Sequence, residues 1–371
     1  MPARRLGVTL MVAGEPSGDT LARAVFPAIR SAGAALYYGP AGPLPGGIER
    51  VGTAPSAGMG LASAPTRLGR TALALRLLLQ LAESRRVSRV VLFNWTEASA
   101  WLGRKLRARG VAVLQVVAPQ VFAWRPDRLR TFGESCDALA VLFAFEEPLW
   151  RAAGVDATFV GHPLAESELP AVASHELGAS RRIALLPGSR DGEIRRLLPA
   201  FLGAGELLRE DGCDPYVVLS NRVPATRRAA ARAACVHARL PVVELAADAR
   251  LGDAIAGCAV AITASGTATL ECALANVPPV IAYRADFVTA MFFRLMARTR
   301  WIGLPNILLG RGVFPELLQG AASATNLYKA ACGVLAAPPQ VREELLPLVL
   351  SPQGRSFGEH VAALANKIGR E

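Results

Sequence analysis

The sequence has few of the residues from which metal centres and disulfide frameworks are built. Its four histidines show no ligand spacing, and its six cysteines (136, 213, 235, 258, 272 and 332) form no C-x-x-C pair. No D-x-D motif, a carboxylate pair suited to a metal-bound diphosphate, occurs either. These absences argue against a structural metal and against a disulfide scaffold. We therefore expect buried thiols, no metal ion and no cofactor.

Long apolar runs and a secretory signature are also missing. No run approaches the roughly 18 apolar residues that a membrane-spanning helix needs, and the N-terminal segment lacks a small-residue cleavage site. We therefore expect a cytoplasmic protein. A hydrophobic content of 52% with 19% charged residues is typical of a globular chain. The length of 371 residues favours two domains.

Positive charge is in excess, with 41 Lys and Arg against 30 Asp and Glu, or +11. An anionic partner is expected: nucleic acid, an anionic membrane or a phosphorylated substrate. No basic block is interleaved with aromatic residues, which disfavours nucleic acid. Residues 66–86 predict an apolar helix with several arginines, which suits either a membrane interface or burial against a sheet. A second apolar, basic segment spans residues 287–301.

Short runs rich in Val and Leu alternate with helical stretches in both halves of the chain. This alternation predicts parallel sheets covered by helices on both faces. We expect an α/β protein with two facing, doubly wound, Rossmann-like domains and a ligand cleft between them. The expected boundaries are 1–165 for the first domain, 166–340 for the second, and 341–371 for a helical tail that packs back on the first. Residues 159–166 are the expected linker.

Two loops in the second half carry the clearest chemical signal. Residues 186–193 (LPGSRDGE) and 265–271 (SGTATLE) each connect an apolar strand to a helix. A Gly/Ser turn at such a position exposes main-chain N–H groups at the positive end of a helix, which suits a phosphate. Arg190 adds a cation with paired donors for a diphosphate. Glu271, expected in the first helical turn, is placed to accept hydrogen bonds from ribose hydroxyls.

The order of these and other motifs resembles the lipid-A-disaccharide synthase family, glycosyltransferases of the GT-B fold. The matching segments are AGEPSGDTL at 13–21, VAPQVFAWRPDR at 117–128, FVGHPLAE at 159–166, LPGSRDGEI at 186–194, SGTATLECAL at 265–274, GLPNILLGR at 303–311 and PELLQ at 315–319.

The resemblance implies a metal-independent, inverting transfer of 2,3-diacylglucosamine from UDP to 2,3-diacylglucosamine 1-phosphate at the inner face of the cytoplasmic membrane. The product is a β-1,6-linked disaccharide, and UDP is released. The residues that the resemblance assigns to the UDP-sugar are Gly188, Ser189, Arg190, Glu193, Ser265, Gly266, Thr267, Glu271, Asn306 and Gln319. Ser17 and Gly18 match the acceptor-side loop, together with Glu15 and Asp19.

The acceptor side departs from the family pattern. Where the family has an Asp-Phe-Asn triplet, whose Asp is a leading candidate for the catalytic base, this chain has Glu97, Ala98 and Ser99. We therefore expect Glu97 to act as base, with Glu15 and Asp19 as alternatives and Arg190 stabilising the departing UDP. Three other functions stay open at this point: a GT-B enzyme with another acceptor, a UDP-sugar epimerase, and an inactive protein bound to an anionic membrane surface. The oligomeric state is also open.

Overall fold

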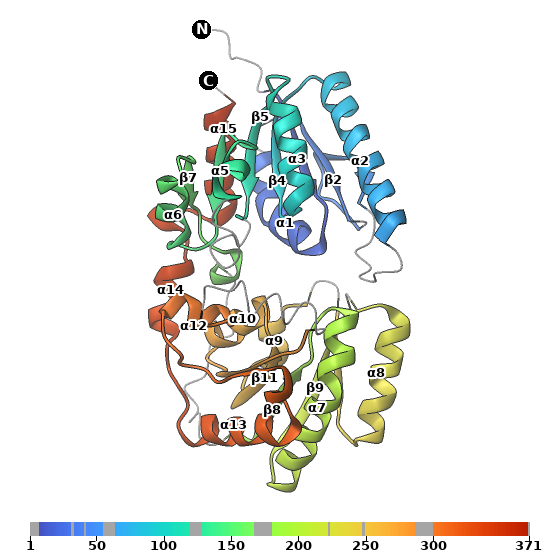
Figure 1. Ribbon diagram of the computed structural model, residues 1–371, viewed down its shortest axis with the longest axis vertical. Coiled ribbons are helices and arrows are strands. Elements are labelled where there is room, and N and C mark those ends of the chain that lie inside the picture. Colours follow the sequence, from blue (N-terminus) through green and yellow to red (C-terminus); the bar gives the residue numbers. More distant parts are fainter. Residues whose placement is uncertain are drawn as a thin grey trace. The chain divides into compact units, whose positions relative to one another are not determined.

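The computed structural model describes residues 7–30, 33–40, 42–54, 64–118, 128–166, 180–221, 223–246, 249–285 and 300–369. The chain divides into two compact units (Figure 1). Unit 1 comprises Met1–Glu166 and Leu348–Glu371, and unit 2 comprises Ser167–Pro347. The expected boundary at 165/166 thus falls at 166/167, and the returning segment begins at 348 rather than at 341.

Unit 1 contains a parallel seven-stranded sheet in the order β3-β2-β1-β4-β5-β6-β7. Its central strands read as near-continuous apolar runs because both faces are covered. The strands are β1 (Val8–Ala13), β2 (Ala35–Gly39), β3 (Ile48–Thr53), β4 (Val87–Phe93), β5 (Ala112–Val116), β6 (Ala138–Val141) and β7 (Ala157–Phe159).

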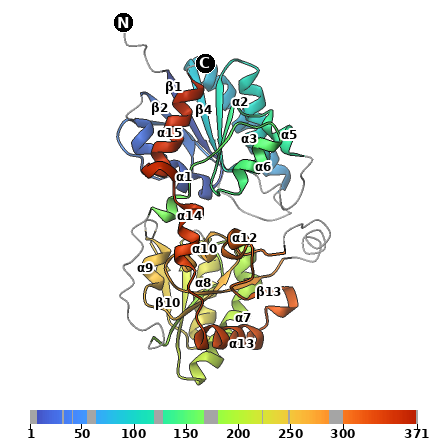
Figure 2. The ribbon, with the colours of Figure 1, turned by 90° about the vertical axis from the view of Figure 1, so that its left-hand side faces the viewer.

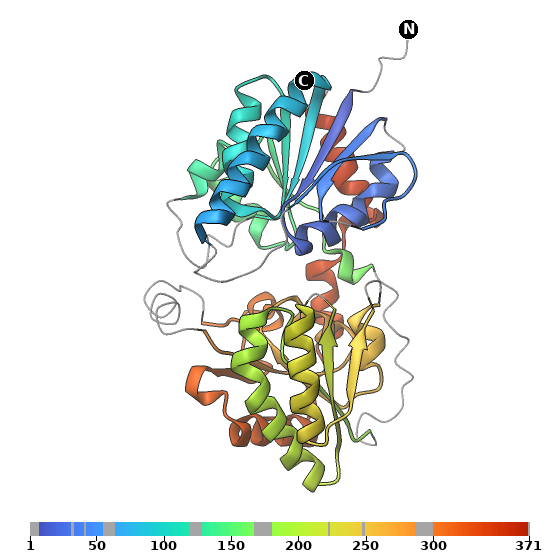
Figure 3. The same cartoon turned by 90° about the vertical axis from the view of Figure 1, so that its right-hand side faces the viewer.

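Alternate side chains of these strands enter two separate cores, as the pleat requires. Leu10 and Val12 pack with helices α2 (Ala64–Ser84), α3 (Thr96–Arg107), α5 (Arg128–Gly133) and α6 (Glu146–Ala152). Met11 and Ala13 face the other way, toward α1 (Pro16–Arg30) and α15 (Phe357–Ile368). Figure 3 shows α2 and α3 in front of the sheet, and Figure 2 shows α1 and α15 together on its opposite face.

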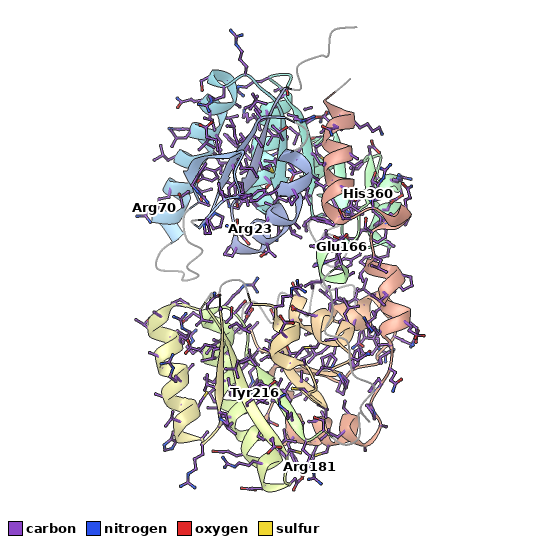
Figure 4. All side chains as sticks on the ribbon, turned by 180° about the vertical axis from the view of Figure 1, so that it is seen from behind. Arg23, Arg70, Glu166, Arg181, Tyr216 and His360 are labelled. Atoms are coloured by element: carbon purple, nitrogen blue, oxygen red, sulfur yellow. The ribbon has the colours of Figure 1, made fainter. Side chains whose placement is uncertain are left out.

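The C-terminal segment completes unit 1 although it is distant in sequence. The main-chain N–H of His162 donates to Val349 at 2.7 Å, and that of Phe357 donates to the Glu166 carboxylate. Figure 4 labels Glu166 and, on α15, His360. Residues 159–166, expected as a linker, are therefore an ordered part of unit 1 that includes the 3-10 turn η2 (Pro163–Ala165). Helix α14 (Arg342–Val349) and the 3-10 turn η4 (Pro352–Gly354) precede α15.

Unit 2 contains a parallel six-stranded sheet in the order β10-β9-β8-β11-β12-β13. The strands are β8 (Arg182–Leu186), β9 (Asp214–Ser220), β10 (Val242–Leu245), β11 (Val260–Ala264), β12 (Pro279–Tyr283) and β13 (Glu316–Leu318). Helices α7 (Asp191–Glu210), α8 (Ala225–His237) and α13 (Ala324–Ala336) share one core with the sheet. The opposite face is covered by α9 (Leu251–Ile255) and α10 (Thr267–Leu274). Helix α12 (Leu304–Leu309) contacts α10, and Figure 3 shows α7 and α8 side by side.

The expected class, two doubly wound parallel α/β domains, is confirmed. Strands β2, β3, β7 and β13 were not predicted, because they are short, partly polar or contain a glycine. In the part of the chain that the structure describes, no helix is long and apolar enough to cross a bilayer.

Candidate functional site

Most of the predicted site residues lie at the carboxyl ends of the strands between which the order of each sheet reverses. In unit 2 the chain moves outward from β8 through β9 to β10, and then from β11 through β12 to β13. The reversal therefore falls between β8 and β11, whose following loops are the two Gly/Ser turns. In unit 1 the same reversal falls between β1 and β4. Such a switch point, at the carboxyl ends of parallel strands, is where doubly wound sheets bind ligands.

The loop after β8 differs from the expected open phosphate cradle. Gly188 has a φ of +112°, which favours glycine. The Glu193 carboxylate, in the first turn of α7, accepts from the main-chain N–H groups of Ser189 at 3.1 Å and Arg190 at 3.2 Å. These two amides are therefore not bare, as the sequence predicted. An internal carboxylate occupies them.

Arg190 remains accessible in spite of this contact. Its guanidinium donates to Glu193 at 2.8 Å, yet 61% of its side chain is exposed. An exposed ion pair of this kind contributes little stability and exchanges partners readily. A diphosphate could therefore take the place of the Glu193 carboxylate on the same donors.

The loop after β11 holds the second set of predicted residues. Gly266 has a φ of +149° and a ψ of −163°, a conformation that side chains disfavour, and it precedes the exposed Thr267. The Ser265 hydroxyl donates to the Ile302 carbonyl at 3.1 Å. Glu271 lies in the second turn of α10 rather than the first, and accepts from the N–H of Gly252 at 3.1 Å. Its carboxylate therefore faces the start of α9.

Asn306 is placed differently from the other predicted donor residues. It is fully buried at 0% exposure, and its amide makes four hydrogen bonds within unit 2. The nitrogen donates to Phe314 at 2.8 Å and Glu316 at 2.9 Å, and the oxygen accepts from Val313 and Phe314, both at 3.0 Å. The expectation that Asn306 lines a ligand cleft is not met, since its hydrogen-bonding capacity is used internally.

Gln319 and Arg284 meet at the carboxyl ends of β13 and β12. The Gln319 side-chain oxygen accepts from Ala285 N at 3.3 Å, while its main-chain carbonyl accepts from Arg284 at 3.1 Å. Sequence reasoning missed Arg284. A single arginine directly after a predicted strand was the only signal available for it.

The acceptor-side loop in unit 1 is closely packed against the end of β4. Gly18 is required there, because a Cβ would lie 2.6 Å from the Phe93 carbonyl oxygen. The Asn94 amide donates to the Ser17 hydroxyl at 3.0 Å. The structure therefore brings the loop after β1 and the loop after β4 together, as binding at this switch point requires.

The three candidate bases in this region differ in their surroundings. Both oxygens of Asp19 are engaged, one by the Tyr37 hydroxyl and the other by Arg23 at 2.8 Å. Burial and the hydrogen bond to Asp19 raise the pKa of Tyr37 well above its usual range, so this phenol stays protonated. Glu15 is partly exposed, and Glu97 is exposed in the first turn of α3. Asp19 therefore suits a structural role better than proton transfer.

Backbone strain marks the same edge of unit 1. Val117, directly after β5, has a φ of +77°, and Asn94, directly after β4, has a φ of +34°. A positive φ is costly for a β-branched residue and is concentrated at functional sites. Residues 119–127 of the motif that Val117 begins lie outside the described part of the chain.

Helix α2 combines the two alternatives that its sequence left open. Leu75 and Leu78 are buried against the sheet, whereas Leu73 and Leu77 are 59% and 54% exposed. The exposed leucines are four residues apart and so lie on one face of the helix. The exposed Arg70 and Arg76 are close to them in sequence. Most of the second apolar, basic segment (287–299 of residues 287–301) lies outside the described residues.

Comparison with known proteins accounts for these motifs. The family model described as lipid-A-disaccharide synthetase matches residues 9–344. Lipid-A-disaccharide synthase of Syntrophus aciditrophicus is 33% identical over 98% of this chain and 94% of its own length.

Two solved structures show the same fold at low identity. A putative UDP-N-acetylglucosamine 2-epimerase from Listeria monocytogenes is 14% identical, with a TM-score of 0.57 over 96% of this chain and 94% of that chain. S. aureus MnaA, in a co-structure with UDP, is 12% identical, with a TM-score of 0.60 over 95% and 94%. These likenesses confirm the expected GT-B fold. The family match decides between transferase and epimerase, and the chain belongs to the lipid-A-disaccharide synthase family, UDP-sugar-dependent glycosyltransferases that form the lipid A disaccharide.

Proposed function

We propose that the carboxyl edge of the unit 2 sheet binds the UDP part of the acylated donor. The observation that carries this proposal is the meeting of both predicted loops at the β8/β11 switch point, where Arg190 is exposed. The diphosphate binds Arg190 and the amides of Ser189 and Arg190, where it replaces the Glu193 carboxylate. Glu271 accepts from the ribose hydroxyls, and Gly266 allows close approach of the main chain.

Replacement of Arg190 by alanine tests the donor site. We expect UDP affinity to fall about tenfold or more, since a charge-assisted pair contributes about 1.5–3 kcal/mol. Arg181→Ala is the matched control. Arg181 precedes β8 at the opposite edge of the same sheet, where its guanidinium contacts the Gly212 carbonyl at 3.2 Å (Figure 4). Unchanged UDP affinity in Arg190→Ala, measured by calorimetry, would contradict this assignment.

The acceptor sugar phosphate is assigned to the β1/β4 switch point of unit 1. There the Glu97 carboxylate takes the proton of the attacking acceptor hydroxyl. The hydroxyl oxygen forms the new bond to the anomeric carbon, and the bond from that carbon to the β-phosphate oxygen breaks with its electron pair leaving on UDP. Direct displacement of this kind inverts the anomeric centre. Ser17 and Asn94, hydrogen-bonded to one another, line the approach to this edge.

Glu97→Gln tests the base with little change in size. We expect turnover to fall about 10²–10⁴-fold, as for the loss of a general base, while UDP affinity stays within twofold. Asp19→Asn is the control. We expect Asp19→Asn to lower the stability of the fold, because it weakens the contacts with Tyr37 and Arg23, and to retain more turnover than Glu97→Gln does. A nearly active Glu97→Gln enzyme would move the assignment to Glu15.

We further propose that the leaving UDP is stabilised by Arg190 and main-chain N–H groups without a metal ion. These donors are already directed at one anion, the Glu193 carboxylate, in the described structure. We expect full turnover in excess EDTA, and a loss that added Mg²⁺ restores would refute this part.

Membrane association is assigned to the exposed face of α2, and it places the enzyme at the inner surface of the cytoplasmic membrane. Leu73 and Leu77 supply apolar contacts, and Arg70 and Arg76 supply charge for anionic headgroups. The net charge of +11 acts in the same direction.

The double variant Leu73→Ser/Leu77→Ser tests this surface in a vesicle-sedimentation assay. Transfer of two exposed leucine side chains from water into the membrane contributes about 3 kcal/mol. The partition coefficient of the variant onto vesicles containing anionic phospholipid should therefore fall by about two orders of magnitude. Val236→Ser, at a valine 69% exposed on α8, is the control and should partition as the parent does. Equal binding by the α2 variant and the parent would refute the assignment.

A further inference from the structure

Arg284 joins three segments at the carboxyl edge of the unit 2 sheet. It follows β12 directly, and its guanidinium donates to the carbonyls of Arg196 at 3.2 Å, Gln319 at 3.1 Å and Ala322 at 2.9 Å. These carbonyls belong to the second turn of α7 and to the turn after β13. Within the described ranges, no carboxylate lies at salt-bridge distance from Arg284. The residue therefore holds these three segments in a fixed arrangement.

The residue that Arg284 fixes most directly is Gln319. Gln319 has a φ of +51°, a left-handed conformation that costs a non-glycine residue free energy and persists only where its surroundings enforce it. The Arg284 bond to the Gln319 carbonyl and the Ala285 bond to its side-chain oxygen are such constraints. Because a main-chain N–H can only donate, the bound side-chain atom must be the amide oxygen. The side-chain N–H₂, with no partner among the described residues, is left as a pure donor.

The bond from Arg284 to α7 indicates which part of the donor meets this group. The Arg196 carbonyl, which accepts from Arg284, lies in the second turn of α7, and the proposed diphosphate site lies at the start of the same helix. The group attached to the diphosphate, an acylated glucosamine, is therefore within reach of Arg284 and Gln319. Its acyl carbonyl oxygens can only accept, and so complement a donor-only N–H₂ group.

We propose that Gln319 recognises an acyl carbonyl oxygen of the donor sugar and that Arg284 is the positioning residue that holds Gln319 for this contact. The proposal rests on the UDP site proposed above. It makes this pair a determinant of the KM for the donor rather than of UDP affinity.

The decisive variant is Gln319→Glu, which keeps an oxygen for the Ala285 bond and replaces the N–H₂ donor by a second acceptor. We expect the KM for UDP-2,3-diacylglucosamine to rise about tenfold, with the Kd for UDP and the acceptor KM within twofold of the parent. Arg284→Met should raise the same KM, and Arg284→Lys should do so by less.

The control for Arg284 is Arg209→Met. Arg209 lies near the end of α7, where one nitrogen donates to the carbonyls of Ala238 at 3.0 Å and Arg239 at 2.9 Å. We expect it to lower the melting temperature without changing the donor KM. An unchanged donor KM in Gln319→Glu, or equal effects of Arg284→Met and Arg209→Met on that KM, would overturn the inference. Failure of the parent enzyme to bind UDP would instead refute the proposed donor site.

Discussion

Replacement of Asn306 by alanine distinguishes an internal role from a ligand-binding role. The asparagine amide joins the start of α12 to the segment that enters β13. Without this amide, the N–H groups of Val313 and Phe314 and the carbonyl of Phe314 would each lose a hydrogen-bonding partner. The Glu316 carboxylate would lose one of its hydrogen bonds. Glu316 would keep its bonds from Ile302 and Gly303, both at 2.9 Å.

The expected loss of stability follows from these four bonds. Three bonds between neutral groups contribute about 1 kcal/mol each and the bond to a carboxylate about 2 kcal/mol, which sets an upper limit because such losses are not additive. We therefore expect the free energy of unfolding to fall by about 3–5 kcal/mol. For a domain of this size, that lowers the melting temperature by about 10 °C.

Calorimetric unfolding and UDP titration of the same variant provide the test. Asn326→Ala is the control, because Asn326 is exposed and its amide makes a single bond, to the Ala321 carbonyl at 3.1 Å. We expect it to change stability by less than about 1 kcal/mol. An Asn306→Ala protein with the parent's melting temperature and a large loss of UDP affinity would refute the internal role and restore Asn306 as a ligand.

Three further predictions follow from individual contacts. Glu193→Gln should raise UDP affinity about threefold, because it removes the carboxylate charge that competes with the diphosphate. Glu359→Gln, in the capping box of α15, is the control and should leave UDP affinity unchanged. Weaker UDP binding by Glu193→Gln would show instead that the carboxylate assists the ligand. Burial raises the pKa of Glu146 to about 8, so the folded state retains a proton that the unfolded chain loses near pH 4.5, and the free energy of unfolding falls as pH rises through this range. Glu146→Gln should therefore be more stable than the parent by about 3 kcal/mol at pH 7 and by little at pH 4. A stability difference that does not change with pH would refute the assignment. Gly18→Ala should lower the free energy of unfolding by about 1–3 kcal/mol, because the added methyl group clashes with the Phe93 carbonyl. Gly69→Ala is the control, since Gly69 has open space around it, and should not destabilise the protein. Equal melting temperatures of the two variants would refute the close contact.

Runs of apolar residues predicted most of the strands, including the partly exposed β10, and missed the short or irregular strands as well as the buried β2. Strands β8 and β11 are continuous apolar segments followed by Gly/Ser turns, so their type and their position beside the site could be predicted. Strand β3 has the sequence IERVGT, and β13 has only three residues, so neither has a clear period. Such strands form because a neighbouring strand offers a hydrogen-bonding edge, which is a tertiary effect.

Site residues could be predicted only as far as their chemistry is local. Turn glycines such as Gly188 and Gly266 follow from the need for a positive φ between a strand and a helix. The partners of long side chains do not follow from the sequence. The Glu193 carboxylate accepts from main-chain N–H groups of the loop that precedes its own helix. The Asn306 amide is bound by main-chain groups from Val313 onward, seven or more residues away in the sequence. Both were predicted as ligand residues, and the structure shows that each first serves the chain itself.

Positive charge acts in two distinct ways at the proposed donor site. Arg190 is compensated by Glu193, so a diphosphate that binds there exchanges one anion for another and gains only the difference between the two interactions. Among the described residues, Arg284 donates to neutral carbonyls, which hold its guanidinium in place without offsetting its charge, so it adds positive potential at the same edge. At the proposed donor site Arg190 would contact the phosphates directly, whereas Arg284 would act on them only at a distance. For this reason we expect Arg190→Ala to reduce UDP affinity far more than Arg284→Met, although both remove one positive charge.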